Sequence, residues 1–160
     1  MTSLWQWLYD LPLSSSLRAS IWAFPVLECI HIYSMVSLIA LFVAFDFRLM
    51  GLALGRRQER QPISHLASVV FRWIWIPVFV NAVTGGLMFM QNAVSYAGNW
   101  AFRCKMLFIL CGLLYHVPLL LKARRWDEHS ETPRWIKVIS VPSVVIWFAV
   151  IVASRWIAYT

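Results

Sequence analysis

Four long apolar runs, separated by short polar stretches, constrain this chain more than any other feature of its sequence. A helix needs about 20 mostly apolar residues to cross a bilayer. Helices that could do so are expected at about 21–45, 69–90, 106–121 and 136–156, and Pro62 is a suitable first residue for an earlier start of the second. The sequence therefore predicts an all-α membrane protein, a four-helix up-down bundle with short connections.

Composition supports one membrane domain over residues 1–160. Of the 160 residues, 61% are hydrophobic and only 13% are charged, whereas a soluble domain of this size needs a more polar surface. The formal net charge is +7, but the basic residues flank the apolar runs and form no stripe interleaved with aromatics. We therefore expect a lipid bilayer as partner and no nucleic acid. The three cysteines form no CxxC pair, which argues against a disulfide framework.

Residues 1–20 differ from the four runs. This segment is interrupted by Asp10, Pro12 and three serines, and it lacks the basic leader and cleavage site of a signal peptide. Trp5 and Trp7 favour a short helix that lies in the membrane interface and is retained in the mature protein.

The distribution of basic residues predicts the orientation. Ten flank the first and third connections, namely Arg48, Arg56, Arg57, Arg60, Arg72, Lys122, Arg124, Arg125, Arg134 and Lys137. Four lie on the other side, namely Arg18, Arg103, Lys105 and Arg155. Because basic loops stay in the cytoplasm, we expect a bacterial cytoplasmic (inner) membrane protein with both termini in the periplasm.

His31 and His116 are the leading candidate site residues. An ionisable ring inside a membrane is costly and usually functional, and paired imidazoles are a common way for a membrane bundle to bind haem. At 1.5 Å per residue, the two rings fall within about 7 Å of the same depth. We expect them to be the axial ligands of one haem b. Further cofactor-binding residues are expected one turn before each histidine and at the start of the third span: Glu28, Gly112, Arg103 and Lys105.

Other polar residues have two interpretations each. His65 could bind a second haem, but a histidine near the interface needs no special function; His129 is expected in a solvated loop. Asp46 and Arg72 are expected to form an ion pair near the inner end. Small and polar residues in the second span favour either close helix packing or room for a flat cofactor: Asn81, Thr84, Gly85 and Gly86.

Soft side chains in the outer half suggest a different ligand. Cuprous copper prefers thiolate and thioether sulfur, although ordinary apolar packing is the commoner role of methionine. The residues concerned are Cys29, Met35, Met88, Met90, Cys104 and Met106. No HExxH, Walker, GxSxG or Rossmann motif occurs, so nothing supports a hydrolase or a nucleotide-driven function.

Several motifs carry a resemblance. The stretch from Ser20 to Leu52 contains a W..P..E..H pattern and ends in DFRLMGL; TGGLMF follows at 84–89 and N.AFR.K at 99–105. Together they resemble a bacterial family of small four-span inner-membrane proteins of unknown function, over about Trp5 to His116. The resemblance implies the four-span fold without an activity, and it singles out Glu28, His31, Asp46, Arg48, Asn99, Arg103, Lys105 and His116.

The sequence thus predicts a membrane cytochrome b-type electron-transfer protein, or a subunit of a membrane oxidoreductase that works with quinone and other redox subunits. Two alternatives stay open. One is a copper- or metal-handling membrane protein that uses the outer Met, Cys and His residues. The other is a structural subunit of a larger membrane complex, in which each histidine only bonds a neighbouring helix.

Overall fold

The computed structural model describes residues 2–52, 62–126 and 134–159 of the chain. Within these ranges, four helical stretches are long and apolar enough to cross a membrane: Ala23–Met50, Ile63–Gln91, Trp100–Ala123 and Val138–Trp156. The all-α, four-span fold predicted from the sequence is therefore confirmed. The first three of these helical stretches extend beyond the predicted spans. Charged residues at their ends keep their backbone hydrogen bonds in the helix while their side chains reach the interface. The second span begins near Pro62, as the sequence allowed.

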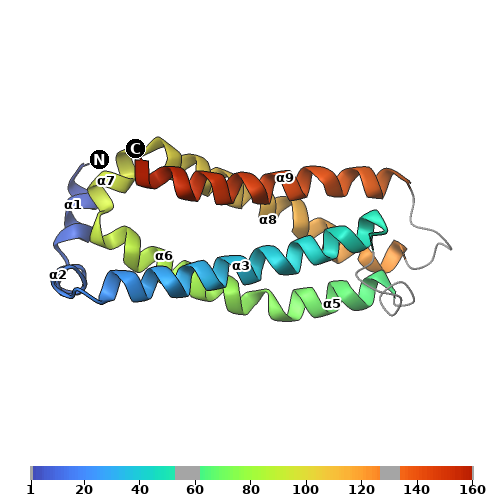
Figure 1. Cartoon of the computed structure of the whole chain (residues 1–160), viewed down its shortest axis with the longest axis horizontal. Helices are drawn as coiled ribbons and strands as arrows, with labels where there is room; N and C mark the ends of the chain where they lie inside the picture. The colour runs from blue at the N-terminus through green and yellow to red at the C-terminus, as the bar shows by residue number, and fades with distance from the viewer. Residues whose placement is uncertain (1, 53–61, 127–133, 160) are drawn as a thin grey trace.

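The described elements follow one another along the chain as short and long helices. They are α1 (Thr2–Asp10), α2 (Pro12–Ala19), α3 (Ala23–Met50), α5 (Ile63–Trp73), α6 (Trp75–Gln91), α7 (Ala93–Gly98), α8 (Trp100–Trp126), α9 (Arg134–Trp156) and the 3-10 turn η1 (Ile157–Tyr159). The long helices alternate in direction, and both chain ends lie at one end of the bundle (Figure 1). We call this the termini end, and the opposite one the far end.

The second span consists of two helices because of a proline. Pro77 has no backbone N–H, so the carbonyl of Trp73 loses its partner four residues on, and α5 ends at that residue. Around the bundle, α3 packs against α6 and α9, while α8 packs against α9 and α5. This is the neighbour pattern of an up-down bundle.

Two other prolines lie inside long helices. Pro118 is within α8 and Pro142 within α9. Each leaves the carbonyl four residues earlier, on Leu114 and Val138, without its usual intrahelical donor. By contrast, α3 stops at Gly51, whose left-handed backbone (φ 79°) lets its own N–H donate to the Arg48 carbonyl and the Leu52 N–H donate to the Phe47 carbonyl.

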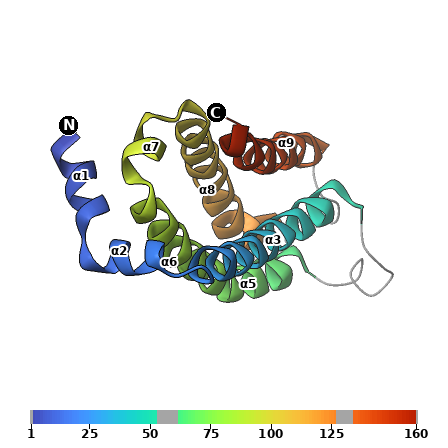
Figure 2. The ribbon, with the colours of Figure 1, turned by 60° about the vertical axis from the view of Figure 1, so that its left-hand side comes forward.

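The N-terminal helices α1 and α2 have nine and eight residues, too few to cross a bilayer. They stand at the termini end on the side of α6 and α7, opposite α9 (Figure 2). The buried Ser14 hydroxyl donates to the Met90 carbonyl at 2.8 Å, and Trp5 packs edge-on against Phe89 at 5.6 Å. These contacts fix α2 and α1 to the end of α6.

The apolar core lies in the far half of the bundle. It includes Leu38, Phe42, Phe45 and Leu49 of α3 and residues of α5, α8 and α9, among them the fully buried Trp147. Large apolar side chains on the outer faces are exposed, as lipid-facing residues are in a membrane helix bundle.

Candidate functional site

A group of polar side chains is enclosed in the far half, inside the apolar core. Three helices each bring to it a pair of residues four apart and therefore on one helical face. The pairs are Phe42 and Asp46 from α3, Gly112 and His116 from α8, and Ser143 and Trp147 from α9. We call Asp46, His116, Ser143 and Trp147 the Asp46 cluster; each has 0% of its surface exposed.

The carboxylate of Asp46 is held by two partners through one oxygen. The Ser143 hydroxyl donates to Asp46 Oδ2 at 2.6 Å, and His116 Nε2 lies 3.3 Å from the same oxygen. Since the hydroxyl hydrogen of Ser143 points at the carboxylate, the hydroxyl oxygen of Ser143 accepts from His116 Nε2–H at 3.0 Å. The other carboxylate oxygen, Oδ1, is buried and has no hydrogen-bond partner among the described residues.

The second ring nitrogen of His116, Nδ1, faces one hydrogen-bond donor and one acceptor. Trp147 Nε1–H donates to Nδ1 at 3.3 Å, while the Gly112 carbonyl oxygen lies 3.1 Å from the same nitrogen. Nδ1 can accept from the indole only when it carries no proton, and it can donate to the carbonyl only when it does. The site therefore offers a hydrogen bond to either protonation state of this nitrogen.

Aromatic rings close the cluster. Phe42 lies 4.0 Å from the His116 ring, centroid to centroid, and stacks on Trp147 at 5.0 Å. A Cβ on Gly112 would come within 3.0–3.3 Å of the Trp147 indole, so the glycine makes room for that ring. Trp147 therefore occupies the space beside Gly112 that the sequence assigned to a cofactor.

A hydroxyl outside the cluster joins the same two helices. The Tyr115 hydroxyl donates to the Ile139 carbonyl, which ties α8 to α9 one residue from His116. Sequence reasoning found no motif in the fourth span and missed Ser143 and Trp147. Their spacing of four residues, equal to that of Gly112 and His116, is the signal that could have revealed a shared face.

His31 lies in a separate place, near the termini end of the α3–α6 contact. Its Nδ1 is 2.9 Å from the Thr84 hydroxyl, which donates its own hydrogen to the Val80 carbonyl at 2.7 Å. The hydroxyl must therefore accept from Nδ1–H, and Nε2 keeps its lone pair. The Asn81 backbone is a further hydrogen-bond partner of the ring. Beside the ring, Asn81 donates to Ser34, which donates to the His31 carbonyl.

The structure does not bring His31 and His116 together. His116 contacts Asp46, and Asp46 follows His31 by fifteen residues on α3, which is about 22 Å along a helix. In addition, both nitrogens of His116 already face protein groups. One iron atom cannot bind both rings in this arrangement. The sequence prediction failed because the depth of His116 was estimated from the expected span boundaries, which placed the ring too near the termini end.

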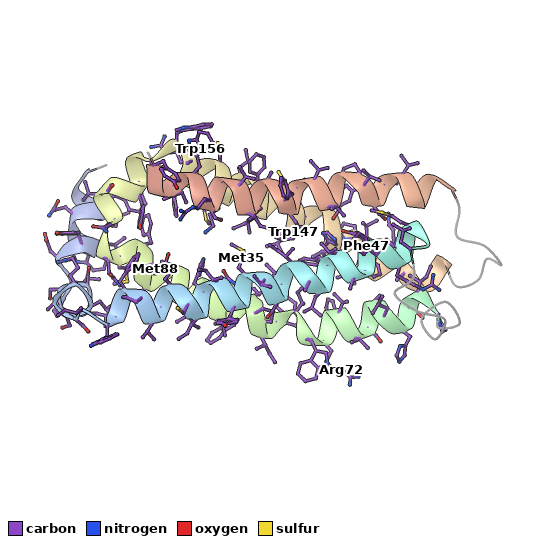
Figure 3. The ribbon with its side chains drawn as sticks, in the orientation of Figure 1. Met35, Phe47, Arg72, Met88, Trp147 and Trp156 are labelled. Atoms are coloured by element: carbon purple, nitrogen blue, oxygen red, sulfur yellow. The ribbon has the colours of Figure 1, made fainter. Side chains whose placement is uncertain are left out.

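The predicted Asp46–Arg72 ion pair is wrong. Asp46 pairs with His116 and Ser143, whereas Arg72 is exposed and points away from the bundle (Figure 3). A snorkelling arginine reaches the interface at little cost, so it does not need the buried acid. His65 is exposed near the start of α5, and His129, Arg56, Arg57 and Arg60 lie outside the described residues.

The residues expected to surround a cofactor have dispersed roles. The Arg103 guanidinium donates to the Ala97 carbonyl at 2.7 and 3.1 Å and so closes the end of α7. Lys105 is half-buried, its charge acts on His31, and no hydrogen-bond acceptor for it occurs among the described residues. Glu28 is exposed; burial, and then the negative charge of Glu28, raise the pKa of the Tyr96 phenol in α7. Glu28 thus acts at the termini end.

The soft side chains do not form a cysteine-based metal site. Cys29 and Cys111 are exposed and Cys104 is half-buried, all as free thiols. Among the described residues, no three His, Cys, Asp or Glu side chains gather in a way that could hold a metal ion. Met35 is buried in the core, in the packing role that the sequence left open for it.

The two neighbouring glycines of α6 provide a matched test of the His31 seat. A Cβ on Gly85 would lie 3.1 Å from His31 Cε1, whereas one on Gly86 would meet nothing within 4 Å. We expect Gly85→Ala to lower the free energy of unfolding by roughly 1–3 kcal/mol relative to Gly86→Ala. Unfolding in mixed micelles, followed by circular dichroism, measures the difference. Equal stabilities would show that His31 can move aside freely.

The fold and the site define a multi-pass helical membrane protein that encloses a carboxylate, an imidazole and a hydroxyl in its core. The chain belongs to a family of unknown function, DUF6644, whose model matches residues 19–160. Comparisons with the curated proteins and with the solved structures found no match to the chain.

Proposed function

We propose that this membrane protein works by binding and releasing a proton at the Asp46 cluster. The observation that carries the proposal is a fully buried carboxylate that faces a histidine yet leaves one oxygen, Oδ1, unpartnered among the described residues. A purely structural pair is expected to satisfy all of its buried polar atoms. Ionisable groups are kept inside membranes, despite their cost, mainly in proton and ion pathways.

The chemistry of the pair suits this role. With His116 neutral and Asp46 ionised, the dry core holds one net negative charge; uptake of one proton makes the pair neutral overall. Burial therefore favours uptake, and His116 Nδ1 has the Gly112 carbonyl ready to accept from the added hydrogen. Release restores the Trp147 hydrogen bond.

Magnetic resonance of the protein in lipid nanodiscs tests the proposal. Labelled Asp carboxyl carbons and His ring nitrogens should show Asp46 or His116 changing protonation as the pH is lowered across the neutral range. Asp46→Asn and His116→Gln should remove that transition, and His65→Gln, at an exposed histidine, should keep it. Signals of both residues that stay constant over this range would identify the cluster as a structural link and overturn the proposal.

A second candidate function is the cytochrome-type electron transfer expected from the sequence, now with His31 as the protein ligand. The supporting observation is the orientation of its ring: Nδ1–H is fixed by Thr84, and Nε2 presents a lone pair. Metal-binding histidines typically donate their other N–H in this way. A haem b bound there would supply one-electron transfer, with quinone and redox subunits as partners. Lys105, whose charge acts on His31, is the candidate partner for a propionate.

An absorption spectrum of protein made with ample haem tests this candidate. One protein ligand predicts a five-coordinate, high-spin ferric haem, which His31→Ala removes and His116→Ala keeps. A low-spin spectrum lost in both variants would instead require a rearranged bundle and contradict the single-ligand form. Bound copper without a Soret band would favour the metal-handling alternative, and neither cofactor would exclude both.

We also propose which membrane holds the protein and which side its termini face. The ten-to-four division of basic residues supports a bacterial cytoplasmic membrane with both termini in the periplasm. Alkaline phosphatase, which folds only outside the cytoplasm, should be active when fused after Thr160, and green fluorescent protein at the same place should be dark. A bright fluorescent fusion with an inactive phosphatase would reverse the orientation.

A further inference from the structure

Trp147 is the largest fully buried side chain among the described residues, and the single polar atom of its indole contacts His116. Trp side chains that are buried usually find an acceptor for the indole N–H. Here the acceptor is an atom that can itself take up a proton. The hydrogen bond of the indole is therefore tied to the protonation state of the Asp46 cluster.

The geometry makes two hydrogen bonds mutually exclusive. His116 Nδ1 lies 3.3 Å from Trp147 Nε1 and 3.1 Å from the Gly112 carbonyl. When Nδ1 is bare, the indole bond forms and the carbonyl faces a lone pair. When Nδ1 carries a proton, the carbonyl accepts it and the indole N–H loses its acceptor.

The surroundings limit where the indole can go. Phe42 stacks on it at 5.0 Å, and the missing Cβ of Gly112 is the space that admits it. Among the described residues, the titratable groups seen in contact with His116 are Asp46 on α3 and Tyr115 on its own helix; Arg48, two residues beyond Asp46, is half-buried. On α9, Ser143 and Trp147 contact His116, and on α5 His65 and Arg72 are exposed. Trp147 thus contributes the hydrogen-bond donor that keeps Nδ1 bare.

We propose that Trp147 is a positioning residue that holds His116 with its proton on Nε2, facing Asp46 and Ser143, and that loses its hydrogen bond when Nδ1 is protonated. The inference rests on the proposed proton-binding role of the cluster and names the side chain that controls it. Proton uptake then has a mechanical result, because it frees a buried indole that joins α9 to α8.

Two variants remove the indole bond by different routes. Trp147→Phe deletes the donor and keeps most of the ring volume. Gly112→Ala keeps the tryptophan but places a Cβ within 3.0–3.3 Å of it, which moves the indole from its seat. Trp73→Phe, at an exposed tryptophan of α5, is the control.

Nitrogen magnetic resonance of labelled histidine, at one neutral pH in nanodiscs, gives the readout. In the wild type and in Trp73→Phe, His116 Nδ1 should be bare and Nε2 protonated. In Trp147→Phe and Gly112→Ala, the ratio of protonated to bare Nδ1 should rise by roughly tenfold, the effect of one lost buried hydrogen bond. A change in Trp147→Phe alone still supports the inference, since Gly112→Ala then leaves the indole in reach.

A bare Nδ1 in both folded variants would overturn the inference and leave Trp147 as a space-filling residue. This outcome is separate from failure of the proposed function. The proposed function fails if neither Asp46 nor His116 titrates in the wild type, whereas the role of Trp147 is judged from the position of the histidine proton at a single pH.

Discussion

Asp46→Ala is expected to lower the free energy of unfolding by about 3–5 kcal/mol, because it removes one member of a fully buried pair and leaves the other without its partner. The Ser143 hydroxyl loses its acceptor at the same time. Unfolding in mixed detergent micelles, monitored by circular dichroism, measures the change. Asp10→Ala is the matched control, since that carboxylate is exposed on α1 and accepts from the Gln6 side chain one turn earlier.

The double variant Asp46→Leu with His116→Leu tests whether the pair, and not the carboxylate alone, causes the loss. Replacement of a buried ion pair by apolar side chains of similar volume is often neutral or stabilising. We therefore expect the double variant to be more stable than Asp46→Ala. A double variant as unstable as the sum of two single losses would show that the residues act independently.

Phe42→Ala should have an effect of similar size, about 3–5 kcal/mol, for a different reason. The ring has 1% of its surface exposed and covers both His116 and Trp147, so its removal leaves a cavity against the Asp46 cluster. The same unfolding measurement applies. Phe79→Ala, with 69% of its side chain exposed on α6, should change the stability little, because no cavity forms on a lipid-facing surface.

The cavity also predicts a change in solvent access. A polar cavity of this kind takes in water, so the indole N–H of Trp147 should exchange its hydrogen faster in Phe42→Ala than in the wild type. A stability loss in Phe42→Ala as small as that in Phe79→Ala would mean that the surrounding side chains collapse into the space of the missing ring.

The four spans could be predicted from the sequence because hydropathy and helix length depend on local residues alone. The start of the second span next to Pro62 follows from the same local rules. The partner of His116 could not be found in this way. Its identity depends on how far α8 slides along α3, and an error of a few residues in a span boundary moves the ring by most of a helical turn.

Two sequence signals were present but were assigned to the wrong neighbour. Gly112 was expected to open space for a cofactor, and it opens space for Trp147. Asp46 was paired with Arg72, which has the opposite charge and a similar predicted depth. An arginine that snorkels to the interface, however, leaves an interior carboxylate without that partner. The Phe42–Asp46 spacing shows that this carboxylate shares a face with a core aromatic, which indicates the interior and not the interface.

Pro118 and Pro142 give the Asp46 cluster a distinctive backbone. Pro118 follows His116 by two residues and Pro142 precedes Ser143 by one, so both helices lack a backbone hydrogen bond close to the residue that grips the carboxylate. Helices bend most readily where such bonds are missing. The residues that hold the carboxylate therefore lie beside two points of α8 and α9 where the backbone ladder is already interrupted, so these helices can bend there without losing a further backbone hydrogen bond.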